Sequence, residues 1–309
     1  MTLTQLEYVV AVDTHRHFGI AAEHCFVTQP TLSMQIQKLE DELGIRIFDR
    51  SRQPVMPTDI GLHIISKARI VLREAGQIKQ VILEQQDTMS GEIRVGIIPT
   101  LAPYLLPSLF KHMRETYPQV ELIIKEAITD DLVFELRNNR LDCGLVVTPL
   151  EDSSITEEPL FYEELFLYVS KNNPLFHQKT VSTRDIDPDQ LWLLEEGHCF
   201  RSQILNLCDK RKTADFQFRY ETGNIDTLKR MVEKSDGMTI LPELAVREFS
   251  KAELRLVKRF RKPAPVREVS LVTHRDHLKT KLIQTLKTEI QHILPKPMQK
   301  LFSRKVVDM

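Results

Sequence analysis

The feature of the sequence that most constrains its fold is a change of hydrophobic pattern near Gly91. Before that point, apolar residues recur at helical spacing through nearly all of the first ninety residues. After it, short apolar runs alternate with amphipathic stretches: strand Ile93–Ile98, a helix at about 102–116, strand Val120–Glu126, a helix at about 130–138 and strand Cys143–Thr148. Such alternation is typical of a parallel α/β sheet. We therefore expect a helical N-terminal part followed by an α/β part.

The composition of the chain indicates its class of protein and its compartment. The 309 residues are 42% hydrophobic and 28% charged, as in water-soluble globular proteins, and their number allows two or three domains. The N-terminus lacks the pattern of a signal peptide, and no apolar run reaches the roughly 18 residues of a membrane span. We expect a cytoplasmic protein without a membrane partner, in which any disulfide is transient and redox-linked. The spacing of its four cysteines predicts neither a metal site nor a cofactor.

Two short helical patterns separated by a tight turn occupy residues 20–43. The second has an apolar stripe at Leu32, Ile36, Leu39 and Leu43, and Gly44 ends it. This is a helix-turn-helix pattern, whose second helix reads DNA in many proteins. Polar side chains outside the stripe, and the arginines of the following segment, are the candidate DNA-binding residues: Gln29, Pro30, Thr31, Ser33, Gln35, Lys38, Arg50 and Arg52.

The charge balance of this region argues against DNA binding. Residues 1–57 hold five Lys and Arg side chains against seven Asp and Glu side chains, whereas DNA-binding domains are usually basic. No acidic side chain occurs from Gln29 to Gln35, however. Affinity would then depend on few phosphate contacts per subunit and on several copies per site. A long helical pattern at 58–88, with a wide apolar stripe, suits pairing with a second copy.

The motifs of this region resemble the winged helix-turn-helix of LysR-type transcriptional regulators. The matching stretches are Ala21-Ala22, Thr28-Gln29-Pro30-Thr31-Leu32-Ser33, Leu39-Glu40-Asp41-Glu42-Leu43-Gly44 and Ile47-Phe48-Asp49-Arg50. Met34 stands where that family most often has an arginine. The resemblance implies an α/β chain with an N-terminal winged helix-turn-helix, a long linker helix and a two-lobed effector domain resembling periplasmic binding proteins.

The resemblance and the patterns together divide the chain into four parts. We expect a DNA-binding domain at 1–57, a linker and dimerisation helix at 58–90, an effector domain at 91–298 and a disordered tail at 299–309. Within the effector domain, lobe I would cover about 91–162 and 267–298, and lobe II about 163–266.

The segment Gly197–Lys210 carries two cysteines, Cys199 and Cys208, in a helical pattern that follows an expected strand at Leu191–Leu194. Nine residues of helix separate two Cα atoms by about 13 Å, and a disulfide needs about 7 Å or less. Two buried, unrelated thiols are one reading. The other is a pair that bonds only when the helix from Phe200 to Leu207 unwinds. A thiol in the first turn of a helix, beside His198 and Arg201, is favourably placed for a lowered pKa.

Within the LysR family, Gly197-His198-Cys199 with Arg201 and a cysteine nine positions later resembles the switch of peroxide-sensing members. That resemblance implies that hydrogen peroxide oxidises Cys199 to a sulfenic acid, that Cys208 then forms the disulfide, and that no metal takes part. It also implies a peroxide pocket of Thr100, Thr129, His198 and Arg267. From the residues alone, capping of the helices that follow is the favoured role of both threonines.

Three functions remain open at this stage. The first is a peroxide-sensing transcriptional regulator, with promoter DNA, hydrogen peroxide, RNA polymerase and thioredoxin- or glutaredoxin-type reductants as partners. It would be a homo-oligomer, in the form of a dimer of dimers. The second is a LysR-type regulator that senses a metabolite and has incidental cysteines. The third is a thiol peroxidase, which the helix-turn-helix pattern disfavours, so we expect the protein not to be an enzyme.

Overall fold

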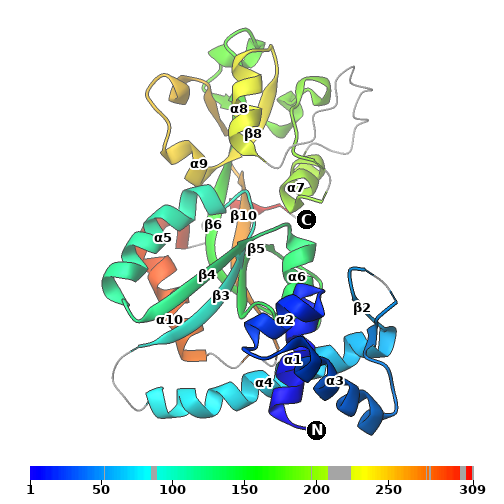
Figure 1. Cartoon of the computed structure of the whole chain (residues 1–309). Coiled ribbons are helices and arrows are strands. Elements are labelled where there is room, and N and C mark those ends of the chain that lie inside the picture. The colour runs from blue at the N-terminus through cyan, green and yellow to red at the C-terminus, as the bar shows by residue number, and fades with distance from the viewer. Residues whose placement is uncertain are drawn as a thin grey trace. The chain divides into compact units, whose positions relative to one another are not determined.

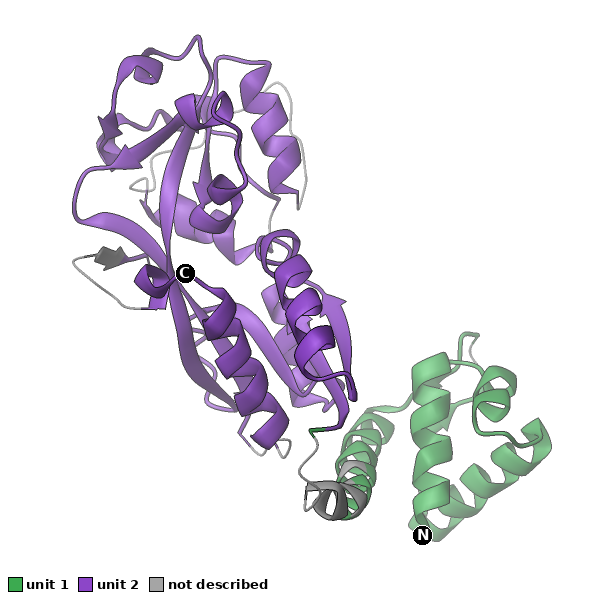
Figure 2. Cartoon of the chain, turned by 90° about the vertical axis from the view of Figure 1, so that its left-hand side faces the viewer, with its two compact units in different colours: residues 1–89 green, residues 90–309 purple. Residues whose placement is uncertain are grey.

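The computed structural model describes residues 1–51, 53–84, 89–195, 197–207, 224–275, 277, 280–299 and 304–307. The chain divides into two compact units, Met1–Met89 and Ser90–Met309 (Figure 2). Among the helices so described, none is long and apolar enough to cross a membrane.

The first unit is helical, as the periodicity predicts. Its elements are α1 (Leu3–His15), α2 (Phe18–His24), α3 (Gln29–Leu43), β1 (Phe48–Asp49), β2 (Met56–Pro57) and α4 (Asp59–Glu84). The stripe Leu32, Ile36 and Leu39 of α3 is fully buried among residues of α1, α2 and α4. Gly44 ends α3 in the left-handed conformation. Strands β1 and β2 pair antiparallel and form the wing that follows the helix-turn-helix.

The second unit is an α/β domain built on a mixed sheet (Figure 1). Its strands are β3 (Gly91–Ile97), β4 (Val120–Glu126), β5 (Cys143–Thr148), β6 (Ile155–Val169), β7 (Thr180–Val181), β8 (Met238–Pro242), β9 (Val257–Phe260), β10 (Ala264–His274) and β11 (Arg304–Val306). Its α-helices are α5 (Ala102–Thr116), α6 (Thr129–Arg137), α7 (Cys199–Leu207), α8 (Ile225–Glu233), α9 (Glu243–Arg247) and α10 (Thr280–Ile293). Short 3₁₀ helices lie at Pro174–His177, Thr183–Asp185, Pro188–Gln190, Glu253–Arg255 and Lys296–Gln299.

Strand β6 joins two lobes. Its first part, up to Glu164, pairs antiparallel with β10, and its second part, from Leu165, pairs with β8 and β9. Lobe I holds β3, β4 and β5 in parallel, with α5, α6 and α10. Lobe II holds β7, β8 and β9 with α7, α8 and α9, and has its own apolar core. The two-lobed α/β fold that the sequence predicts is thus confirmed.

Two local expectations are wrong. The segment Leu191–Leu194 forms only a single bridge, from Leu191 to Met238, and no strand. The expected disordered tail contains β11, which pairs parallel with the first residues of β10. Val307, next to β11, is 5% exposed within the core of lobe II. The polar composition of the tail gives no sign of this strand. The strand forms because the first residues of β10 offer an edge with which it can pair.

Candidate functional site

The backbone at Gly197 sets the direction in which α7 begins. Gly197 has φ +94°, a conformation that other residues adopt only under strain. A Cβ added there would lie 3.3 Å from the side chain of Ile128. The chain then enters α7 with Cys199 as its first residue. This turn therefore brings the thiol to the loop that precedes α6.

Cys199 is half-buried, and its surroundings both raise and lower the pKa of its thiol. Burial raises the pKa of Cys199 above its ordinary value of 9.0. The hydroxyl of Thr129, the guanidinium of Arg267 and backbone amides of the first turn lower it. The net effect is a raised pKa, contrary to the expectation from the sequence. Removal from water destabilises the thiolate more than these neighbours stabilise it. The same neighbours are those that would stabilise a thiolate once it forms.

Arg267 is the largest fully buried side chain beside the thiol. Its Nε and Nη2 lie 2.8 Å from Oε2 of Glu163. Nη1 donates to the Thr100 hydroxyl at 2.8 Å, and Nη2 donates to the Thr100 carbonyl at 3.2 Å. The guanidinium lies over the Phe200 ring, 5.0 Å from its centre. One cation thus joins β6, β10, the turn before α5 and the first turn of α7.

Neither threonine caps a helix. The Thr100 hydroxyl accepts from Arg267, and α5 begins after Leu101 without a side-chain cap. Thr129 is the first residue of α6, whose N-cap position is Ile128. The Thr129 hydroxyl oxygen is buried and makes no conventional hydrogen bond within the described chain. It does contact the Cys199 thiol, and a buried hydroxyl with so few partners is suited to bind a small polar reactant.

His198 is buried to 6% exposure, and its Nε2 lies 3.5 Å from Oε1 of Glu195. It lies on the wall of a pocket of about 720 Å³ that also includes Thr129, Gly197 and Cys199. Arg201 donates to the carbonyl of Leu194 at 2.9 Å, which fixes the segment that leads into α7. The pocket wall therefore brings together Cys199, Thr129 and His198. Arg267 and Thr100 are not part of this wall.

Helix α7 is held by apolar contacts and by one buried amide. Phe200 and Ile204 are fully buried in the core of lobe II. Gln203 is fully buried too, and its Nε2 donates to the carbonyl of Val307 at 3.1 Å. Cys208 lies outside the described residues, directly after the last residue of α7. In the described ranges, no three His, Cys, Asp or Glu side chains are grouped to hold a metal ion.

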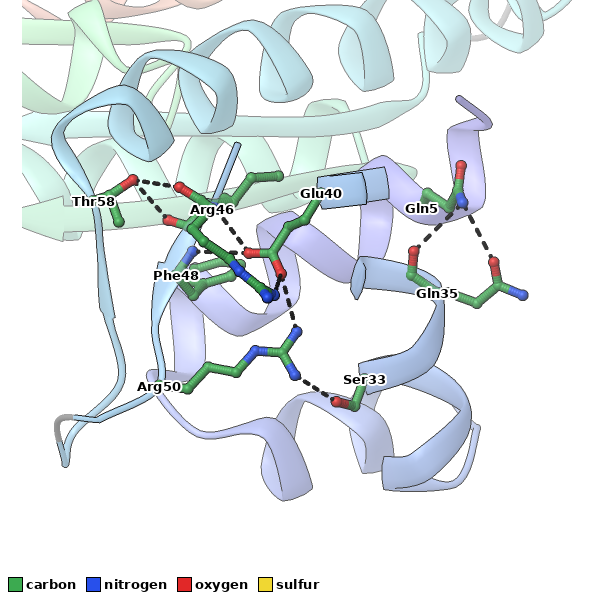
Figure 3. Close-up of polar contacts among 9 residues, drawn as sticks. Gln5, Ser33, Gln35, Glu40, Arg46, Phe48, Arg50 and Thr58 are labelled. Atoms are coloured by element: carbon green, nitrogen blue, oxygen red, sulfur yellow. Dashed lines mark hydrogen bonds and ion pairs between the residues drawn. The ribbon is translucent and has the colours of Figure 1, made fainter. Parts of the chain in front are cut away.

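The candidate DNA-binding residues of α3 differ in exposure. Gln29, Pro30 and Lys38 are exposed, and Thr31 is half-buried, with its hydroxyl 2.9 Å from that of Thr28. The half-buried Gln35 accepts from Nε2 of Gln5 through both its carbonyl and its side-chain oxygen, each at 3.4 Å (Figure 3).

Two further candidates, Ser33 and Arg50, contact each other. Arg50 Nη1 donates to the Ser33 hydroxyl at 3.1 Å, and its Nη2 lies 3.2 Å from Glu40 (Figure 3). Glu40 is 1% exposed and also accepts from the backbone amides of Ile47 and Phe48. Arg50 thus anchors the wing to α3 as well as facing outward. Arg52 lies outside the described residues.

Three functional contacts escaped the sequence reasoning: Glu40 with the wing, Glu163 with Arg267, and Gln203 with the tail. Glu163 and Gln203 stand in mainly apolar stretches, and a lone polar residue in such a stretch signals a buried partner. That signal does not identify the partner residue, because each of the two partners lies 104 positions away in the chain.

Both units of the chain are similar to known proteins. Residues 3–62 match the bacterial regulatory helix-turn-helix of the lysR family, and residues 86–294 match the LysR substrate binding domain. The chain is 38% identical over 272 residues to the DNA-binding transcriptional dual regulator OxyR of Escherichia coli K12, covering 88% of this chain and 89% of that one.

Two solved structures are also similar. A full-length cysteine-to-aspartate variant of OxyR from Pseudomonas aeruginosa superposes with TM-score 0.80 at 33% identity, covering 94% of this chain and 98% of that one. A cysteine-to-serine variant of OxyR from Corynebacterium glutamicum, with hydrogen peroxide bound, has TM-score 0.62 at 26% identity, covering 94% and 92%.

Proposed function

The chain belongs to the LysR family of bacterial helix-turn-helix regulators, and we propose that it is a transcriptional regulator that senses hydrogen peroxide through Cys199. The observation that carries the proposal is the half-buried Cys199 at the start of α7, which is hydrogen-bonded to Thr129, feels the charge of Arg267 and lines a pocket shared with His198. The similarity to OxyR proteins supports the choice of hydrogen peroxide.

The first chemical step is oxidation of Cys199. The thiolate sulfur attacks one oxygen of hydrogen peroxide, the O–O bond breaks, and hydroxide leaves and is protonated to water. Sulfur loses two electrons and becomes a sulfenic acid, while the peroxide is reduced. Thr129 and His198 border the space where the peroxide would bind, and Arg267 favours the anionic sulfur. Since burial raises the pKa of the thiol, these neighbours limit how much thiolate is available.

The second step forms the disulfide. The Cys208 thiolate attacks the sulfenic sulfur, the S–O bond breaks, and hydroxide leaves as water after it takes up a proton. Cys208 follows the nine residues of α7, so the two sulfurs meet only if the helix unwinds. Unwinding takes Phe200 and Ile204 out of the core of lobe II. Oxidation thereby changes the surface of the effector domain.

The signal would reach DNA through the oligomer. Exposed apolar residues of α4, among them Ile60, Leu62 and Ile78, offer a surface on which two copies pair. We propose a dimer of dimers that contacts promoter DNA with Gln29, Pro30 and Lys38 and acts through RNA polymerase in the cytoplasm. Thioredoxin- or glutaredoxin-type proteins would reduce it again.

One observation favours a second function, the sensing of a metabolite. A pocket of about 380 Å³ lies between the strand ends of lobe I and the start of α8, lined in part by Tyr104, Glu126, Asn224 and His198. In such a regulator, a ligand of this pocket would change DNA binding whether or not Cys199 is present. A thiol peroxidase would instead turn peroxide over continuously and bind no promoter.

The test is to oxidise the reduced full-length protein with one equivalent of hydrogen peroxide. Disulfides are then mapped by mass spectrometry, and a promoter is footprinted with both forms. We expect a Cys199–Cys208 bond and a changed footprint, both lost in Cys199→Ser and both kept in the control Cys25→Ser. If Cys199→Ser keeps the peroxide response, the proposed function is wrong.

A further inference from the structure

We infer that Glu163 is a positioning residue of the peroxide reaction, which holds the Arg267 guanidinium in place beside the Cys199 thiol. The inference rests on the proposed function and assigns a role to a carboxylate that does not itself reach the reacting atoms.

The Glu163 carboxylate has two buried contacts that fix it. Oε2 accepts from the Arg267 guanidinium at 2.8 Å, and Oε1 accepts from the backbone amide of Leu244 at 2.7 Å. Both members of the ion pair have no exposed side-chain area. Glu163 belongs to β6, and Leu244 lies in the first turn of α9 in lobe II. The carboxylate thus has one orientation, set from both lobes.

This orientation fixes the guanidinium in turn. Glu163 takes up Nε and one side of Nη2, so Nη1 is directed to the Thr100 hydroxyl and the planar face lies on Phe200. Phe200 follows Cys199 directly in α7, and in this arrangement the guanidinium lowers the pKa of the thiol. An arginine fork bound along one edge keeps its plane fixed, which a single contact would not achieve.

Without the carboxylate, Arg267 would be a buried cation with only uncharged partners. Arginine does not lose its proton in proteins, so the cost of burial would be relieved by movement of the side chain toward solvent. The thiolate would then lose its only charged stabiliser named above. Burial raises the pKa of the Glu163 carboxyl, and the guanidinium acts against this effect, so the two groups depend on each other.

The test uses the full chain in a Cys208→Ser background, which prevents disulfide formation. The rate of Cys199 alkylation by iodoacetamide is followed by mass spectrometry from pH 6 to 10, and the rate of oxidation by hydrogen peroxide is measured at pH 7.5. We expect Glu163→Gln to raise the alkylation midpoint by about one pH unit and to slow oxidation about tenfold, the effect of one nearby cation. Glu163→Asp should give intermediate values.

The matched control is Glu289→Gln, which removes a carboxylate bound to His112 and Tyr117 in lobe I. This variant tests for a general loss of stability. It should change neither the alkylation rate nor the oxidation rate. Thermal unfolding is measured for every variant. If the alkylation midpoint of folded Glu163→Gln is unchanged, the role of Glu163 is purely structural. If the midpoint is lowered, Glu163 only offsets the charge of Arg267. Either result overturns the inference. If the parent chain does not react with peroxide, the proposed function fails, while the alkylation midpoint still decides the role of Glu163.

Discussion

A single buried carboxylate, Glu40, joins helix α3 to the wing that follows it. Glu40 is 1% exposed and binds Arg46, Arg50 and two backbone amides of the wing. Removal of the carboxylate leaves the buried backbone amides of Ile47 and Phe48 without their acceptor, which costs about 1–3 kcal/mol for each group. We therefore expect Glu40→Ala to lower the free energy of unfolding of the DNA-binding unit by roughly that amount, and to weaken promoter binding. Denaturant unfolding followed by circular dichroism measures the first effect.

A neighbouring carboxylate provides the control for this prediction. Glu42 forms an ion pair with the N-terminal amine, and both groups are about half exposed. Exposed pairs contribute about 1 kcal/mol or less. An equal loss of stability in Glu42→Ala and Glu40→Ala would contradict the role given to burial.

Acid should weaken lobe II at Glu253. Hydrogen bonds from Lys229 and Ser250 lower the pKa of the Glu253 carboxyl from 4.5 to about 2. A lowered pKa in the folded state stabilises the fold above the unfolded pKa, and this contribution is lost as pH falls from about 4.5 to about 2. Lys229→Met should therefore be most destabilising near neutral pH, with a difference from the parent chain that shrinks below pH 4.5. Urea unfolding at several pH values measures this, and a difference independent of pH would rule it out.

At the scale of elements, α7 and β11 are the pair that sequence reasoning did not connect. Gln203 of α7 donates to the carbonyl of Val307, which follows β11, and the amide of Val307 donates to the Val266 carbonyl at 2.9 Å. A buried amide without its acceptor costs about 1–3 kcal/mol. Truncation before Arg304 should therefore destabilise α7 and shift the thiol–disulfide equilibrium toward the oxidised form.

Glutathione redox buffers of varied ratio measure that shift, with hydrogen exchange of α7 as a second readout. Gln203→Ala should act in the same direction as the truncation. Ser202→Ala is the matched control, because Ser202 is exposed on the same helix. A truncated chain with the parent chain's equilibrium would show that β11 does not hold α7.

At the scale of the whole molecule, the apolar surface of α4 is the feature that calls for a second copy. Ile78 is 70% exposed on this helix. A charged side chain there should prevent pairing through α4, so Ile78→Glu is expected to yield an assembly smaller than the dimer of dimers in analytical ultracentrifugation. Loss of a two-site contact should weaken promoter binding by roughly a hundredfold or more. Phe134→Glu, at a 54% exposed position on α6, is the control and should keep the oligomer; equal behaviour of the two variants would exclude α4 as the pairing surface.

Patterns within the amino-acid sequence are enough to predict the order and nature of most elements. The strands predicted at Val120–Glu126 and Cys143–Thr148 and the helix at 102–116 have the same bounds in the structure. These predictions depend on periodicity and on residues such as Gly44, which act over a few positions of the chain. The motifs around Gln29–Ser33 and Gly197–Cys199 indicated the family and the thiol in the same way.

Folding, and not local pattern, settles which side chains meet. It brought Glu163, Arg267 and Thr100 together from positions up to 167 residues apart, and it bound Gln203 to a tail expected to be disordered. It also reversed the expected direction of the Cys199 pKa, because helix position and nearby bases can be read from the chain while burial cannot. Local geometry is encoded within a few residues, whereas desolvation and ion pairing depend on segments that become neighbours only after folding.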